Sequence, residues 1–310
     1  MHVNNEMLLA EKKGCDPMNA LLSPVLTKRL ANFKLTSKQI VRGGHKGERR
    51  SQRLGSSLEF SDYRLYSPGD DLRQIDWNTF ARTNKFYIKR FLDEQELSVS
   101  IYLDCTKSMG IVKGKWLRAK QLAAACSFLT LANADRLRFT PIASPSNTYP
   151  DTKGKAMINH VIDFIDQVSI APDEERFGQQ LLHKSRAGKK GSLTILISDF
   201  LDDPDNLFSA LKQMQARHQQ VLLLQVVLPE EMNPDYVGDL QLIDIETTKY
   251  REVSMSQKVI DQYKQLFENH TNQMKSFCQK RGMELIVCPT SQSLEETVFS
   301  TLMHKGWLRR

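Results

Sequence analysis

Short apolar runs separated by amphipathic stretches dominate the chain from residue 97 onwards. In residues 97–103 the apolar side chains recur at every second position, which is the period of a β-strand. Residues 193–198 and 221–228 form near-continuous apolar runs, which are typical of strands buried on both faces of a parallel sheet. Shorter runs at 136–142 and 284–287 predict two further strands of the same sheet.

Between these runs, apolar residues recur at helical spacing. The first helix is expected from about Trp116 to Leu131 and is apolar almost all round, so we expect it to be buried. Further helices are expected around residues 157–168, 177–182, 207–214, 259–277 and 294–302. Strands that alternate with helices predict an α/β fold with a doubly wound, mostly parallel sheet flanked by helices.

Residues 1–95 follow a different pattern and are expected to form an N-terminal extension to a domain that spans residues 96–310. Apolar residues between Leu22 and Val41 recur at helical spacing and predict an amphipathic helix. Between residues 28 and 53 nine basic residues occur with one acid, Glu48. This basic stretch lacks interleaved aromatic residues and any recognisable motif for nucleic-acid recognition. Nucleic-acid binding is therefore a weaker interpretation than binding of a protein.

The string P-G-D-D-L-R-Q-I-D-W follows the basic stretch. Its three acids, Asp70, Asp71 and Asp76, lie among several arginines. Paired carboxylates suit metal binding or acid–base chemistry, but acids mixed with arginines are more often ion-pair partners. We therefore expect them to pair with arginines of this chain.

Composition narrows the class of protein. The chain has 310 residues, a hydrophobic fraction of 40% and a net charge of +7, which suits a soluble globular protein with a sizeable core. The five cysteines are scattered without paired spacing, which argues against a disulfide framework or a zinc site. No run has the length of a signal peptide core or a transmembrane segment, so we expect a cytoplasmic protein.

Oxygen-bearing side chains follow two of the predicted strands. Asp104, Thr106 and Ser108 come at every second residue after the strand at 97–103, and Asp199 follows the strand at 193–198. Carboxyl ends of neighbouring parallel strands meet at one edge of a sheet, where ligands bind. Carboxylate and hydroxyl oxygens suit Mg²⁺. The alternative is structural, with Asp104 capping the next helix and the hydroxyls satisfying loop amides.

At this point the sequence resembles a known family. The D-x-T-x-S loop and the later S-D-F resemble a von Willebrand factor A-type domain, and the P-G-D-D-x-R-x-I-D-W string resembles the bacterial domain-of-unknown-function family 58. The resemblance implies a metal-ion-dependent adhesion site that holds Mg²⁺ or Mn²⁺ through Asp104, Thr106, Ser108 and Asp199. It also implies a protein partner, a MoxR-type AAA ATPase, and no enzymatic activity.

One departure from the family pattern concerns the metal. The fold usually supplies a further threonine before the second aspartate strand, whereas here the segment reads A-P-D-E-E-R-F-G and places Arg176 near that position. A guanidinium there would pair with an aspartate and take the place of the cation.

Two other functions stay open as alternatives to a protein-interaction module. A metal-dependent hydrolase would use the same carboxylates, but none of the histidines falls in either aspartate loop. Nucleic-acid binding would use the basic stretch and would show a steep dependence on salt.

Overall fold

The computed structural model describes residues 21–37, 60–91, 97–171, 176–185, 191–234, 238–243 and 250–310. The chain divides into two compact units, one from Met1–Gly44 together with Leu97–Arg310 and the other from His45–Glu96. The larger unit carries the candidate site.

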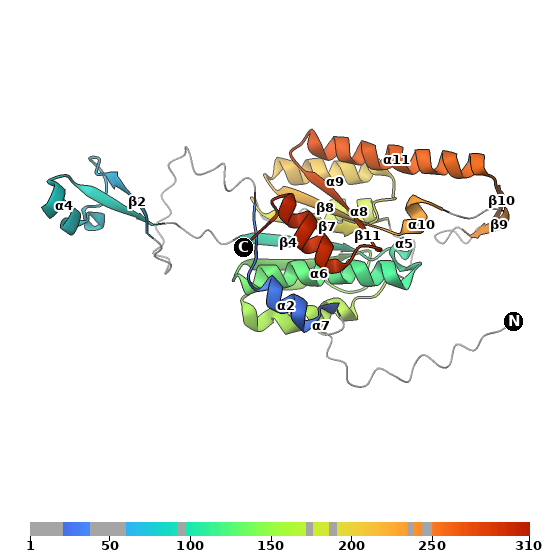
Figure 1. Cartoon of the computed structure of the whole chain (residues 1–310), viewed down its shortest axis with the longest axis horizontal. Helices are drawn as coiled ribbons and strands as arrows, with labels where there is room; N and C mark the ends of the chain where they lie inside the picture. The colour runs from blue at the N-terminus through green and yellow to red at the C-terminus, as the bar shows by residue number, and fades with distance from the viewer. Residues whose placement is uncertain are drawn as a thin grey trace. The chain divides into compact units, whose positions relative to one another are not determined.

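A six-stranded sheet forms the centre of the larger unit, in the order β11-β8-β7-β4-β5-β6 (Figure 1). Its strands are β4 (Ser98–Asp104), β5 (Arg136–Ile142), β6 (Tyr149–Lys153), β7 (Leu193–Ser198), β8 (Gln220–Val227) and β11 (Glu284–Pro289). Only the β5–β6 pair is antiparallel in this sheet. The predicted doubly wound, mostly parallel sheet is therefore confirmed.

Helices cover both faces of the sheet. One face packs against α2 (Pro24–Leu30), α6 (Lys113–Ala132), α7 (Ile158–Gln167) and η4 (Glu296–Leu302). The other face packs against α8 (Phe177–Lys184), α9 (Pro204–Ala216) and α11 (Gln257–Gln279). Two short helices, α5 (Lys107–Gly110) and α10 (Pro229–Met232), follow strands β4 and β8, and a hairpin of β9 (Gly238–Ile243) and β10 (Tyr250–Met255) precedes α11.

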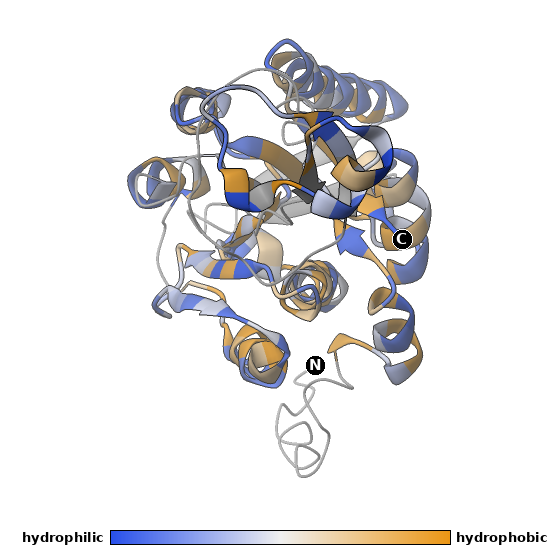
Figure 2. Ribbon diagram, turned by 90° about the vertical axis from the view of Figure 1, so that its left-hand side faces the viewer, coloured by the Kyte–Doolittle hydropathy of each residue, from blue (hydrophilic) through white to orange (hydrophobic). Residues whose placement is uncertain are grey.

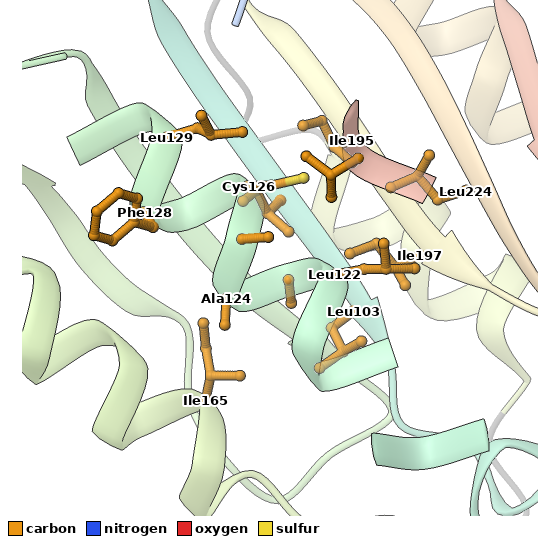
Figure 3. Close-up of a cluster of buried hydrophobic side chains, with 14 of the residues drawn as sticks. Leu103, Leu122, Ala124, Cys126, Phe128, Leu129, Ile165, Ile195, Ile197 and Leu224 are labelled. Carbon is orange, nitrogen blue, oxygen red and sulfur yellow. The ribbon is translucent and has the colours of Figure 1, made fainter. Parts of the chain in front are cut away.

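The core explains why the strands are apolar on both sides. Every residue of β7 and β8 is buried, since helices cover both faces of these central strands. Figure 3 shows Leu122 and Cys126 of α6 directed at Ile195 and Ile197 of β7. In Figure 2 the helices around the sheet show hydrophilic colour on their outer faces. No helix within the described ranges combines the length and the hydrophobicity that a membrane crossing requires.

The N-terminal segment differs from the expectation in two respects. The helix predicted over 22–41 ends at Leu30, and β1 (Lys34–Leu35) then pairs with β12 (Leu308–Arg309), whereas residues 38–41 lie outside the described ones. This segment also belongs to the larger unit, together with the residues from Leu97 onwards. The physical reason is the burial of Leu26 and Leu30 in the core beside α6.

Helix α6 begins at Lys113, three residues before the expected start. Val112 has an extended backbone, and its carbonyl accepts a hydrogen bond from the amide of Lys115 at 3.0 Å. The first helical turn therefore includes Lys115.

The smaller unit contains β2 (Phe60–Leu65) and β3 (Tyr87–Phe91), which pair antiparallel, with η1 (Leu72–Gln74) and α4 (Trp77–Thr83) between them. Arg64 forms a bidentate ion pair with Asp70 at 2.7 Å, and Arg73 pairs with Asp71 at 3.2 Å. These two acids have the expected arginine partners.

Asp76 has a further role in the smaller unit. Its carboxylate caps α4 by accepting hydrogen bonds from the amides of Asn78 and Thr79, and it also accepts one from the Tyr63 hydroxyl at 2.8 Å. Since Asp76 is 7% exposed, the cap is largely shielded from solvent.

Candidate functional site

The site lies where strands β4 and β7 end side by side. The two strands are parallel neighbours, with Leu103 opposite Ile197. The chain leaves β4 towards α6 on one face of the sheet and leaves β7 towards α9 on the other. This divergence is a topological switch point, the place where open α/β sheets form ligand crevices.

The four predicted ligand residues all line one pocket of about 330 Å³ at this point. Asp104 ends β4, Thr106 and Ser108 follow it around α5, and Asp199 directly follows β7. Asp104 and Asp199 are only 1% and 3% exposed, so their charges lie largely out of water. The structure thus brings the four residues together at the same sheet edge.

Asp104 is held by hydrogen bonds from both strand ends. Its Oδ1 accepts from the amide and the hydroxyl of Thr106 at 2.9 and 2.8 Å, and its Oδ2 accepts from the Ser198 hydroxyl at 2.5 Å. The Thr106 hydroxyl lies 3.0 Å from that of Ser108. The structural alternative predicted hydrogen bonds between these side chains and the loop amides. One such bond is present, from the amide of Thr106 to Asp104.

The electrostatics of the pocket disfavour the charged forms of Asp104 and Asp199 together. Burial raises the pKa of Asp104 to about 7, and the nearby charge of Asp199 adds to the effect, although the hydrogen bonds from Ser198 and Thr106 act in the opposite direction. A positive charge bound between the two aspartates would relieve this repulsion.

The structure adds a residue that the sequence reasoning missed. The Nζ of Lys115 donates to Asp199 Oδ2 at 2.9 Å and to Glu231 Oε1 at 2.5 Å, and its side chain is completely buried. Burial lowers the pKa of Lys115, but the charges of Asp199 and Glu231 outweigh burial and raise it above its usual value. Lys115 is therefore a charged ammonium group that contacts Asp199, although it is not among the residues that line the pocket.

A signal for Lys115 exists in the sequence. Lys115, Ala119, Leu122 and Cys126 are spaced like one face of a helix, and the last three are buried. A helix that starts at 113 instead of 116 places the lysine on this inward face. A lysine on a buried helical face requires an acidic partner.

Arg176 stands at the rim of the same pocket. It is exposed, occupies the residue before α8 and lines the pocket beside Phe177. Among the described residues no ion pair joins Arg176 to Asp104 or Asp199. The replacement of a cation by Arg176 stays a prediction, and Lys115 is the cation that contacts Asp199 here.

The residues at this edge fit a hard divalent cation. No group of three or more His, Cys, Asp or Glu side chains in the described ranges could hold a metal, so a cation here would depend on the two hydroxyls as well as the two aspartates. Such oxygen ligands suit Mg²⁺ or Mn²⁺, which retain water in their remaining positions. Lys115 contacts two acids, Asp199 and Glu231, and one ammonium group balances only one of these two negative charges.

Comparison with protein families gives a match over residues 62–273 to the family described as protein of unknown function DUF58. Uncharacterized protein Rv1480 from Mycobacterium tuberculosis (strain ATCC 25618 / H37Rv) is 28% identical over 246 residues, which are 77% of each chain. Uncharacterized protein Mb1516 from Mycobacterium bovis matches with the same identity and coverage.

Solved structures give more distant similarities. BatB from Bacteroides thetaiotaomicron has a TM-score of 0.40 and 17% identity, over 67% of this chain and 98% of that one. The von Willebrand factor type A structure from Catenulispora acidiphila has a TM-score of 0.36 and 15% identity, over 46% of this chain and 35% of that one. The fold class therefore rests on the strand order of the chain itself.

Proposed function

This chain belongs to the DUF58 family, and from that premise we propose that it is a non-enzymatic protein-interaction module. The binding site is the pocket at the ends of β4 and β7. The observation that carries the proposal is the convergence of Asp104, Thr106, Ser108 and Asp199 in this one pocket. In the proposed complex these residues hold Mg²⁺ or Mn²⁺, and the cation supplies a coordination position for an acidic side chain of the partner.

The surroundings of the pocket support a protein contact. Leu201 lines the pocket and is 42% exposed, and Ile111, which directly follows α5, is 52% exposed. Exposed apolar side chains beside a polar centre are typical of protein interfaces.

The chemistry of the pocket supports a role without catalysis. The described lining contains no histidine, and the proposal assigns its buried acids Asp104 and Asp199 to cation binding. Burial raises the pKa of the neighbouring Cys105 thiol far above its usual value, so this thiol is held protonated and is a poor nucleophile.

The proposed partner is a MoxR-type AAA ATPase, and the proposed setting is the bacterial cytoplasm. Both rest on the resemblance of the P-G-D-D-x-R-x-I-D-W segment to its family. The acidic residue that completes the site would then lie on the surface of the ATPase.

Binding of the full chain to the MoxR-type ATPase of the same organism tests the proposal. Surface plasmon resonance in Mg²⁺ should show a complex that weakens at least about tenfold in EDTA and in Asp104→Ala, as expected for loss of a ligand residue. Asp163→Ala is the matched control, because it removes a carboxylate of α7 that does not line the pocket. Equal binding in Mg²⁺, in EDTA and by Asp104→Ala would contradict the proposal.

A further inference from the structure

We infer that Lys115 sets the cation affinity of this site, because its ammonium group competes with a divalent cation for Asp199 while Glu231 draws it away. This inference rests on the proposed function and deepens it. Nothing in the family resemblance assigns Lys115 a role.

Lys115 and its two acidic partners are buried, which is the first observation behind this inference. The Lys115 side chain is completely buried, and those of Asp199 and Glu231 are 4% and 18% exposed. A charged group without water requires partners, and removing one partner of a buried pair leaves the other charge uncompensated. The three groups therefore form one electrostatic unit.

The second observation is how the two aspartates differ. Both aspartates have a donor on each oxygen, but only Asp199 has a charged donor, Lys115 at 2.9 Å from Oδ2, beside the amide of Leu201 at 3.2 Å from Oδ1. Asp104 accepts hydrogen bonds from hydroxyls and one amide. A cation that enters the pocket thus meets its competitor at Asp199.

The third observation is the position of Glu231. Its Oε2 accepts a hydrogen bond from the amide of Leu228 at 2.9 Å, which anchors the carboxylate to the turn after β8, and its Oε1 lies 2.5 Å from Lys115. When a cation takes Asp199, Lys115 keeps Glu231 as its partner and stays paired. Glu231 therefore lowers the cost of releasing Asp199.

A purely structural lysine would give different results. If Lys115 only stabilised the fold, its replacement would lower the melting temperature without any change in metal affinity. The competition instead predicts opposite effects on metal affinity from the loss of Lys115 and the loss of Glu231.

The first experiment tests the pairing without metal. Thermal unfolding of the full chain in EDTA compares Asp199→Asn in the wild-type and in the Lys115→Met backgrounds. The change in melting temperature caused by Asp199→Asn should be more favourable by about 3 °C or more in the Lys115→Met background, where the Asp199 charge has lost its partner. Equal changes in both backgrounds would overturn the pairing.

The second experiment titrates the full chain with Mn²⁺ and follows free Mn²⁺ by electron paramagnetic resonance. Lys115→Met should tighten Mn²⁺ binding at least about tenfold and Glu231→Gln should weaken it by a similar factor, because a net charge is removed close to the ligand in each case. Lys113→Met is the matched control, an exposed lysine in the same helical turn, and should bind like the wild type.

The outcomes separate this inference from the proposed function. Binding of Mn²⁺ by the wild type with no tightening in Lys115→Met overturns the inference and leaves the metal site intact. Absence of Mn²⁺ binding in the wild type and in Lys115→Met overturns both. If Lys115→Met does not fold, Glu231→Gln decides, and an unchanged Mn²⁺ affinity in that variant overturns the inference.

Discussion

Asp104 is both a buried residue and a proposed ligand of the cation. Asp104 is 1% exposed at the end of β4, and it accepts a hydrogen bond from the hydroxyl of Ser198 at the end of the neighbouring strand β7. An aspartate that shares a buried pocket with a second aspartate is costly to keep charged. In the proposed function, a bound cation offsets the combined charge of the two aspartates.

The raised pKa of Asp104 predicts how stability depends on pH in metal-free buffer. Its pKa is about 7 in the folded protein and about 4 in an unfolded chain, so the folded state holds the proton more tightly. This contribution to stability is fully present below about pH 4 and is lost as the pH rises through about 7. Replacing Asp104 by Asn should remove the loss, which is at most about 4 kcal/mol.

Urea unfolding in EDTA at pH 4.5 and at pH 7.5 measures this effect. The difference in free energy of unfolding between Asp104→Asn and the wild type should grow in favour of the variant at the higher pH. Asp163→Asn is the control and should follow the wild-type profile. Parallel profiles for Asp104→Asn and the wild type would show that Asp104 does not titrate in this range.

At the scale of elements, helix α4 depends on a buried cap. Asp76 accepts hydrogen bonds from the amides of Asn78 and Thr79 in the first turn, and from the hydroxyl of Tyr63 on β2. The one carboxylate thus starts the helix and ties it to the hairpin.

Asp76→Ala should therefore lower the stability of the smaller unit by about 1 to 2 kcal/mol, the usual cost of losing a helix cap. Asp76→Asn keeps an acceptor for the amides and should lose less. Thermal unfolding of the full chain, followed by the far-ultraviolet circular dichroism signal, measures both variants. Unchanged melting of Asp76→Ala, together with lost partner binding, would show instead that Asp76 is part of a binding surface.

At the scale of the whole molecule, the N-terminal segment is part of the larger unit. Leu30 at the end of α2 is completely buried in the core, and β1 pairs with β12 at the other end of the chain. The N-terminal segment therefore contributes side chains to the core of the larger unit and a strand that pairs with β12.

Leu30→Ala should destabilise the larger unit by about 2 to 5 kcal/mol, because it leaves a cavity in a packed core. Val25→Ala on the same helix is the matched control, since Val25 is 67% exposed and should change stability by less than about 0.5 kcal/mol. Denaturant unfolding of both variants gives the comparison. A small effect of Leu30→Ala would mean that α2 contributes little to the stability of this unit.

The sequence by itself determined five of the six strands of the sheet and the two aspartates that follow them, but not the order of the strands. Strands covered by helices on both faces are predominantly apolar, so the runs at 193–198 and 221–228 identified β7 and β8 almost to the residue. The prediction that Asp104 and Asp199 meet followed from the geometry of parallel strands, whose carboxyl ends share one edge. The apolar runs are a local signal, whereas the meeting of the two aspartates also required β4 and β7 to be neighbours in the sheet.

Only the tertiary structure decided which charges meet. Lys115 reaches Asp199 and Glu231 from 84 and 116 residues away, and no local pattern specifies such a pairing. The helix start at Lys113 and the partner of β1 at Leu308–Arg309 were decided in the same way. Apolar burial acts through local periodicity, whereas the pairing of buried charges depends on how the elements finally pack.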